Sequence, residues 1–167
     1  MNSLYDFIVE PIGDRYDNKK TVGGKDLILN TKIESWKFVN RLAKVIAVPI
    51  ALHTSIKIGD TIVVHQNIFR RFYNMKGEQS NSRSYFKDNL YFAAVDQIYL
   101  YKNNTTWKSF GDRCFIAPLK NSDSLRNRKE FIIDDQRLYC MKSNDIVIKY
   151  GNKENQEEYN PSWTSSS

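Results

Sequence analysis

Residues 54–64 read Thr54-Ser-Ile-Lys-Ile-Gly-Asp-Thr-Ile-Val-Val64 and carry the clearest structural pattern in the sequence. Ile56 and Ile58 alternate with polar residues, which is typical of a half-buried strand. Gly59-Asp60 then interrupts with a tight-turn signal, because glycine tolerates backbone angles that other residues avoid. The β-branched run 62–64 follows and favours a buried strand. The stretch therefore predicts a strand, a turn and a second strand, as in a small β-barrel.

Strand patterns also precede this stretch. Residues 4–12 are expected to form a first strand, and Pro11 places its end at an edge or rim because proline cannot donate to a ladder. The segment from Trp36 begins with near-helical spacing. Residues 38–48 nevertheless favour a strand, because β-branched residues dominate there and Pro49 follows.

A loop and a closing strand pair are expected after residue 64. Residues 74–84 are hydrophilic and predict a surface loop. Residues 89–101 predict a strand that ends near Ala93, a turn at Asp96-Gln97 and a closing strand over 98–101.

Residues 13–32 differ from the strands around them. They are polar, contain the pair Gly23-Gly24 and lack a clear period, which predicts a flexible loop. The apolar triplet Leu27-Ile28-Leu29 lies in the second half of this segment. One interpretation is that the triplet belongs to the next strand. The other is that it recognises a partner and folds on binding, which keeps the affinity moderate and reversible.

The composition indicates a folded chain rich in β structure. Its 167 residues suffice for one domain with a small appendage, and 41% of them are hydrophobic. Ten Tyr and nine Phe favour strands. No apolar run approaches the ~18 residues of a membrane span, and no signal-peptide pattern starts the chain, so we expect a cytoplasmic protein. The net charge of +6 fits solubility, an acidic partner or a nucleic-acid surface.

The end of the chain partly repeats the earlier pattern. Residues 138–149 echo residues 90–101, and residues 114–119 echo residues 7–12. The second copy is shorter, because nothing in it corresponds to the flexible loop and the central strand pair. We therefore expect a domain over residues 1–104, a partial second β unit over residues 105–150 and a polar tail over residues 151–167.

No pattern in the sequence predicts catalysis or metal binding. His53 and His65 lack a metal-ligand spacing, and no serine lies in a nucleophile-elbow context. No phosphate-binding glycine pattern occurs. Cys114 and Cys140 fit two buried thiols in strands, and carboxylates such as Asp60 lie in turns where they are expected to bond local backbone. We therefore expect no enzymatic activity, no cofactor and no metal.

Residues 69–73, Phe-Arg-Arg-Phe-Tyr, interleave aromatic side chains and arginines. Such a run can stack bases and contact phosphates. Five residues are a small platform, however, and the pattern is also ordinary for a strand that enters a loop. Nucleic-acid binding by an OB-like barrel is therefore kept as an alternative and not as the expected function.

Taken in order, these segments resemble the GroES-type co-chaperonins (chaperonin-10 family), which form the lid of a GroEL-type chaperonin. Five segments carry the resemblance: Tyr5-Asp-Phe-Ile-Val-Glu-Pro11, then Gly23-Gly24 with Leu27-Ile28-Leu29, Lys44-Val-Ile-Ala-Val48, Ile56-Lys-Ile-Gly-Asp-Thr-Ile-Val-Val64 and Asp96-Gln-Ile-Tyr99. The resemblance covers about residues 3–101. It implies an all-β fold with a small GroES-like β-barrel, a mobile loop over about residues 13–32 and an apolar tripeptide that binds the chaperonin.

The sequence also departs from the family pattern. Lys25-Asp26 separate the two glycines from the tripeptide, and only residues 49–55 are available for the roof hairpin. The loop over residues 69–84 is longer, and the second unit is an addition. These departures resemble a co-chaperonin encoded by a tailed phage, acting in the host bacterial cytoplasm, more than a bacterial one.

The resemblance implies a ring, expected to be heptameric, in which each subunit docks its tripeptide into an apolar groove at the chaperonin rim. Gly23 and Gly24 belong to the same binding loop, and nucleotide binds the chaperonin. The alternative is a phage structural or assembly protein that reuses the barrel fold. In that case the second unit and residues 65–84 contact neighbours, and no chaperonin is bound.

Overall fold

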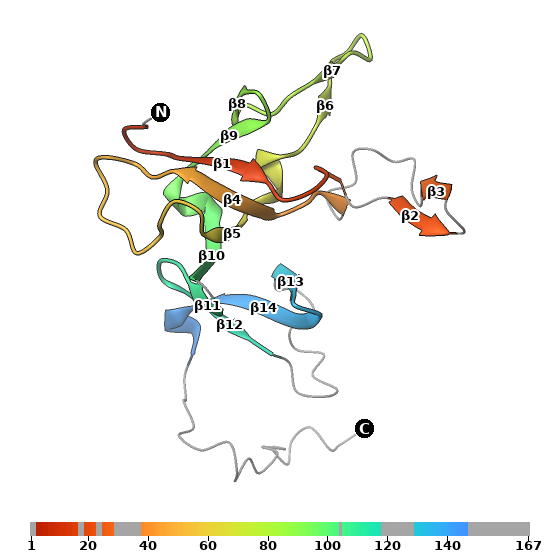
Figure 1. The fold of residues 1–167 in the computed structure, drawn as a ribbon. Coiled ribbons are helices and arrows are strands. Elements are labelled where there is room, and N and C mark those ends of the chain that lie inside the picture. The colour runs from red at the N-terminus through yellow and green to blue at the C-terminus, as the bar shows by residue number, and fades with distance from the viewer. Residues whose placement is uncertain are drawn as a thin grey trace, which may run out of the picture. The chain divides into compact units, whose positions relative to one another are not determined.

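The computed structural model of the chain describes residues 3–16, 19–22, 25–28, 38–103, 105–117 and 129–146. In this described part the regular elements are strands and short 3-10 helices (Figure 1). The all-β fold expected from the sequence is therefore confirmed. The chain divides into two units, Met1–Arg113 and Cys114–Ser167, so the division falls after the expected boundary at residue 104.

Unit 1 is built around one antiparallel sheet of seven strands in the order β11-β10-β5-β4-β1-β9-β8. Two further hairpins, β2–β3 and β6–β7, pair outside this sheet. The strands are β1 (Phe7–Pro11), β2 (Lys19–Val22), β3 (Lys25–Ile28), β4 (Leu42–Ala47), β5 (Thr61–Val64), β6 (Phe72–Tyr73), β7 (Gln79–Ser80), β8 (Tyr85–Lys87), β9 (Leu90–Ala93), β10 (Ile98–Asn103) and β11 (Thr106–Ser109). The 3-10 helices are η2 (Gln66–Ile68) and η3 (Val95–Gln97).

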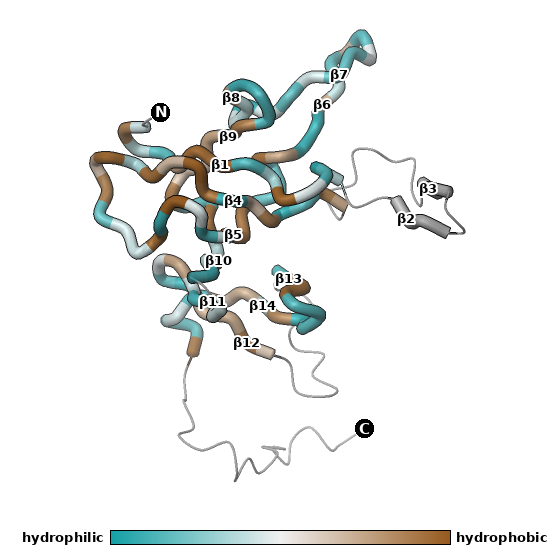
Figure 2. Tube along the Cα trace, viewed as in Figure 1, coloured by the Kyte–Doolittle hydropathy of each residue, from teal (hydrophilic) through white to brown (hydrophobic). Residues whose placement is uncertain are grey.

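The core of unit 1 is formed by apolar side chains of the central strands and of η2. Its largest fully buried members include Tyr91, Phe7, Phe69, Ile56 and Ile62. Burying apolar surface is the main favourable contribution to folding, so these side chains hold the sheet together. Figure 2 shows the contrast between the largely hydrophobic strands of the sheet and the largely hydrophilic β6–β7 hairpin.

The stretch 54–64 forms only one of the two strands expected from it. Its second half is β5, but its first half has no strand structure. The Lys57 N–H donates to Asp60 Oδ2 (2.8 Å), and the Asp60 N–H donates to the carbonyl of Lys57 (3.1 Å). Because these groups bond within the turn, they do not extend a ladder. The period-2 alternation also fails, since Ile56 is 2% exposed and Ile58 is 66% exposed.

The turn itself is fixed to the neighbouring strand β4. The Gly59 N–H donates to the carbonyl of Val45 (2.8 Å), and the Val45 N–H donates to the carbonyl of Asp60 (2.9 Å). Gly59 has a φ of +93°, a conformation that residues with a Cβ rarely adopt. The expectation that the Asp60 carboxylate hydrogen-bonds to local backbone is confirmed. The turn before β5 is held against β4 by backbone hydrogen bonds.

Replacing Asp60 with alanine is expected to destabilise unit 1 by about 1 kcal/mol, because the Lys57 N–H loses its acceptor. The midpoint of urea unfolding measures this change. Lys57→Ala is the matched control, since it truncates an exposed side chain and leaves its own backbone N–H bonded. Equal midpoints for Asp60→Ala and wild type would contradict the role of the carboxylate.

The remaining strand predictions agree with the structure except at their ends. β1 lies within the expected residues 4–12, and β4 lies within the expected residues 38–48. The pattern over residues 89–101 is confirmed, because β9 ends at Ala93, η3 makes the turn and β10 follows. The observed strands are shorter than the patterns over residues 4–12 and 38–48.

Unit 2 is a three-stranded sheet in the order β12-β14-β13, with a 3-10 helix after its last strand. Its elements are β12 (Arg113–Ile116), β13 (Lys129–Ile133), β14 (Gln136–Lys142) and η5 (Ser143–Asp145). This order matches β1-β9-β8 in unit 1, where η3 likewise follows the middle strand of the three.

The two matching hairpins also share their turn. The β8–β9 hairpin turns at Asp88 and Asn89, with φ of 46° and 63°, and the β13–β14 hairpin turns at Asp134 and Asp135, with φ of 47° and 61°. Two successive residues of positive φ are typical of the type I′ turn that joins twisted strands, and Asp and Asn tolerate it. The internal echo in the sequence thus corresponds to a shared arrangement of three strands and one 3-10 turn.

Candidate functional site

The segment expected to carry the binding tripeptide contains the hairpin β2–β3. Its register sets Lys19 opposite Ile28 and Lys20 opposite Leu27. Residues 19–22 and 25–28 of this segment are thus paired strands, and Leu27 and Ile28 belong to the second of them. Gly23, Gly24 and Leu29 lie outside the described residues.

The sequence contained a signal for this hairpin that the loop prediction missed. The glycine pair separates residues 19–22 from residues 25–28 by two positions, a spacing and a composition typical of a two-residue hairpin connection. The charged residues in both runs hid the strand pattern, because strands are usually recognised by their apolar alternation.

Both ends of the segment that carries this hairpin are fixed to unit 1 beside each other. Tyr16 and Val39 form an antiparallel bridge, and both side chains are buried. The Asn40 N–H donates to the carbonyl of Arg15 (2.9 Å), and Asn40 Nδ2 donates to the carbonyls of Ile12 (2.7 Å) and Asp14 (2.9 Å). The chain that ends at residue 16 and the chain that resumes at residue 39 therefore lie side by side, after β1 and before β4.

The run Phe69 to Tyr73 is occupied largely by packing within unit 1. Phe69 is 0% exposed and meets the Tyr91 ring edge-on, with ring centroids 5.0 Å apart. The Arg71 guanidinium lies over the Tyr16 ring (5.4 Å), and the Arg70 guanidinium lies over the Phe72 ring (5.2 Å). Phe69 is therefore closed to a base, whereas Phe72 and Tyr73 of the same run are partly exposed.

Arg15, near the start of residues 13–32, is hydrogen-bonded to the base of the β6–β7 hairpin. Its Nε donates to the carbonyl of Phe69 (3.0 Å), one terminal nitrogen donates to Asn81 Oδ1 (2.9 Å) and the other to the carbonyl of Arg70 (3.4 Å). Its guanidinium lies 5.3 Å from the centre of the Tyr91 ring. Hydrogen bonds from a charged donor are stronger than neutral ones, so Arg15 fixes both strands of the hairpin base.

Burial shifts the pKa values of Tyr91 and Arg15. It raises the pKa of the Tyr91 phenol, and the nearby Arg15 guanidinium acts in the opposite direction without cancelling the effect. Burial likewise lowers the pKa of Arg15. Both directions follow from desolvation, which disfavours the charged form of each group.

Stability is therefore expected to fall at alkaline pH partly through Tyr91. Below about pH 10 the phenol is neutral in the folded and unfolded chains. Above that pH the unfolded chain ionises first, because the folded-state pKa is raised, so unfolding becomes more favourable as pH rises. Tyr91→Phe should lose less unfolding free energy than wild type between about pH 9 and 11, as measured by urea titration at each pH. Tyr73→Phe, which removes the same hydroxyl from a tyrosine outside the core, is the matched control for the substitution itself.

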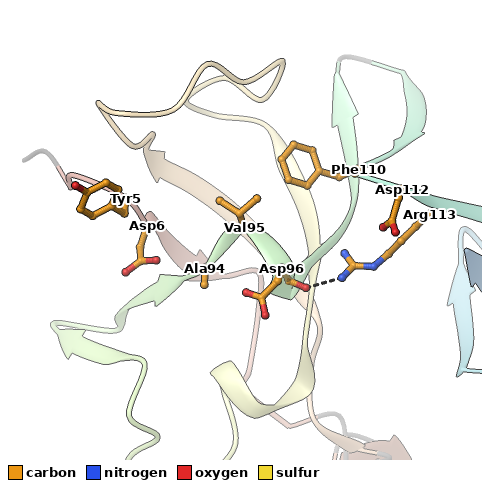
Figure 3. Close-up of a pocket in the computed structure, with 9 residues that line it drawn as sticks. Tyr5, Asp6, Ala94, Val95, Asp96, Phe110, Asp112 and Arg113 are labelled. Atoms are coloured by element: carbon orange, nitrogen blue, oxygen red, sulfur yellow. Dashed lines mark hydrogen bonds between the residues drawn. The ribbon is translucent and has the colours of Figure 1, made fainter.

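A depression of about 500 Å³ lies at the end of the sheet where β9 passes into η3. Figure 3 shows Tyr5, Val95 and Phe110 around it, together with Asp6, Asp96, Asp112 and Arg113. We call it the Val95 depression. A concave surface with an apolar lining and a few polar groups is the usual form of a binding site.

The one arginine in the lining of the Val95 depression is held by backbone. Arg113 donates to the carbonyls of Asp96 (2.6 Å) and Ile98, and its guanidinium lies 4.7 Å from the centre of the Tyr99 ring. Three aspartates share the lining with this arginine. The depression therefore combines apolar side chains with a surplus of negative charge.

The thiols and the imidazoles have structural surroundings. Cys114 and Cys140 are free thiols on β12 and β14, and both are half-buried instead of fully buried as expected. Cys114 Sγ donates to the carbonyl of Met141 (3.6 Å). His65 Nδ1 accepts the N–H of Asn67 (3.2 Å) and so caps η2.

The described part of the chain contains neither a metal-binding cluster nor a membrane-spanning helix. Among residues 3–16, 19–22, 25–28, 38–103, 105–117 and 129–146, no three His, Cys, Asp or Glu side chains are grouped to hold a metal ion. The same part of the chain contains no helix of the length and apolarity that a membrane span requires.

The fold and these sites define an all-β protein with two hairpins that pair outside the main sheet, and comparison with known proteins adds no relative. No protein-family model matches the sequence, and no curated protein or solved structure matches the chain.

Proposed function

We propose that the chain is a co-chaperonin that caps a GroEL-type chaperonin and assists protein folding, including that of phage proteins in a bacterial host. The observation that carries the proposal is the order of the five sequence segments that resemble the GroES family. The place of this segment in the chain supports it, since Tyr16 and Val39 are bridged after β1 and before β4 and the residues between them include Leu27 and Ile28. In the GroES pattern the binding loop lies between the same two strands.

The proposal includes a small β-barrel of the GroES type for unit 1. It is supported by an antiparallel sheet in which strands distant in sequence are neighbours, with β5 between β4 and β10. The Gly59-Asp60 turn, which holds β5 to β4, corresponds to the central turn of the family pattern. In this proposal the turn is a scaffold, and the chain has no catalytic group of its own.

Binding would depend on Leu27, Ile28 and Leu29, with Gly23 and Gly24 allowing the loop to adapt. Burying three such side chains contributes ~1.5–3 kcal/mol each before the ordering of the loop is subtracted. A ring, in this proposal of seven subunits, multiplies these weak contacts because later contacts are effectively intramolecular. Capping is then tight overall and still reversible when the chaperonin changes state.

The test is the mass of the particle in solution, with and without a GroEL-type chaperonin and ATP. The proposal expects a ring-sized particle that joins the chaperonin only when nucleotide is present. A particle that does not bind the chaperonin under any nucleotide condition would contradict the co-chaperonin proposal. A change in the chaperonin ATPase rate upon addition of the chain gives a second, independent readout.

The second candidate is a phage structural or assembly protein that uses unit 1 as a scaffold. Exposed apolar side chains on the β6–β7 hairpin favour it, because Met75 is fully exposed and Phe72 and Tyr73 are partly exposed. This candidate predicts self-assembly or binding to another phage protein without any effect on chaperonin ATPase. The ATPase measurement therefore separates the two candidates.

A further inference from the structure

The tip of the β6–β7 hairpin is an ordered turn that presents one apolar side chain to solvent. Asn74 organises it, since its Oδ1 accepts the N–H groups of Lys76 (2.9 Å) and Glu78 (2.9 Å) and its Nδ2 donates to Glu78 Oε2 (2.7 Å). Gly77 completes the turn with a φ of +78°. Met75 at this tip is fully exposed. A turn that is already ordered loses little entropy when it binds.

The base of the hairpin is anchored as firmly as its tip. Arg15 bonds to both sides of the base, as described above, and Ser82 Oγ donates to the carbonyl of Ile68 (2.5 Å) in a buried position. Residues 70–84 contain four arginine or lysine residues and one glutamate, so the hairpin is basic. Its features are thus a fixed base, an ordered tip, an exposed methionine and a positive charge.

The Val95 depression has the complementary features on the same unit. It is concave where the tip is convex, its lining offers Tyr5, Val95 and Phe110 to an apolar side chain, and its aspartates offer negative charge to a basic one. Methionine is unbranched and adapts to irregular apolar surfaces. Lysine can pack its methylene stem on such a surface while its ammonium group reaches the rim.

We propose that the β6–β7 tip of one copy of this chain inserts Met75 into the Val95 depression of a second copy. In this contact Lys76 lies near Asp6 and Asp96 of the second copy. The tip does not occupy the depression of its own chain, because Met75 is fully exposed. Charge complementarity within one sequence is what selects a second copy over an unrelated partner.

Such a contact joins two different surfaces, so it is head-to-tail. Head-to-tail contacts produce closed rings when the rotation closes and open chains when it does not. The inference therefore gives a physical basis for the self-association in the proposed function. It does not depend on chaperonin binding, and a chain that assembles in this way without binding a chaperonin would reject only the co-chaperonin proposal.

Directed crosslinking tests the contact. Two variants, Met75→Cys and Val95→Cys, are purified with tags of different size, mixed and mildly oxidised. We expect the mixture to give a disulfide-linked dimer of one copy of each variant in far higher yield than the same-variant dimers that each variant forms alone, where the native Cys114 and Cys140 report the background. A mixture that gives no more mixed dimer than this background would overturn the contact.

Charge reversal gives the second test. Lys76→Glu and Asp96→Lys should each lower the mass of the particle measured by sedimentation, and the two together should restore it. Lys57→Glu, an exposed charge reversal away from the hairpin and the depression, should leave the mass unchanged. The inference is overturned if the wild-type chain sediments as a monomer, or if the double variant fails to recover while circular dichroism shows it folded.

Discussion

Replacing Phe69 with alanine is expected to lower the free energy of unfolding of unit 1 by about 3–5 kcal/mol. The ring is fully buried, meets Tyr91 edge-on at 5.0 Å and belongs to the cluster that includes Phe7 and Ile68. The substitution removes these contacts and leaves a cavity that the surrounding strands fill only in part. Because domains are stable by only about 5–15 kcal/mol, the variant should lose about a fifth or more of its stability. Urea unfolding, followed by circular dichroism, measures the loss.

The matched control is Phe72→Ala, three residues later in the same run of aromatics and arginines. Phe72 is 39% exposed and its main contact is the Arg70 guanidinium, so its removal should change the stability by at most about 1 kcal/mol. Equal losses at the two positions would show that Phe69 is not the core residue of this run. Salt-dependent retention of Phe72→Ala and wild type on single-stranded DNA would separately test the nucleic-acid alternative.

These two phenylalanines show what the sequence could and could not determine. Both lie in Phe-Arg-Arg-Phe-Tyr, and local spacing alone does not distinguish the buried ring from the exposed one. The distinction depends on η2, whose 3-10 turn directs Ile68 and Phe69 into the core, and on Tyr91 from a strand distant in sequence. Contacts of this kind are set by tertiary packing, which single-sequence patterns do not contain.

The central stretch illustrates the same limit in the backbone. Gly59-Asp60 was correctly predicted as a turn, because glycine and aspartate are required by its local geometry. The prediction of a strand before the turn is wrong, because the N–H groups of Lys57 and Ile56 bond to the side chains of Asp60 and Thr54 instead of to a neighbouring strand. The apolar alternation predicted neither the burial of both isoleucines nor the bonding of the amides, since Ile56 is buried and Ile58 is exposed.

The candidate sites divide along similar lines. The residues expected in the binding segment could be chosen from the sequence, because an apolar triplet in a polar segment is a local signal. The Val95 depression could not, since Tyr5, Val95 and Phe110 come from three separate parts of the chain. The pairing of β1 with β9 brings Tyr5 towards Val95, and the bond from the Phe110 N–H to the carbonyl of Tyr99 (3.0 Å) holds Phe110 beside β10.

Replacing Ile28 with aspartate is expected to abolish chaperonin association while leaving unit 1 folded. The proposed groove is apolar, so the substitution removes an apolar contact and forces a carboxylate either to be buried without a partner or to keep the tripeptide out. Because every subunit of a ring carries the change, the loss is multiplied across the particle. Co-sedimentation with a GroEL-type chaperonin and ATP measures the association, and urea unfolding of the free variant checks the fold.

The position is well suited to this test because the hairpin itself should tolerate the change. The register pairs residue 28 with residue 19, which is a lysine, so a carboxylate at position 28 is expected to be compatible with the pairing. Asn30→Asp adds the same charge two residues further on, outside the tripeptide, and should retain most of the association. Undiminished binding by Ile28→Asp would show that the tripeptide is not part of the chaperonin-binding site. Loss of binding in both variants would instead assign the effect to charge in the segment as a whole.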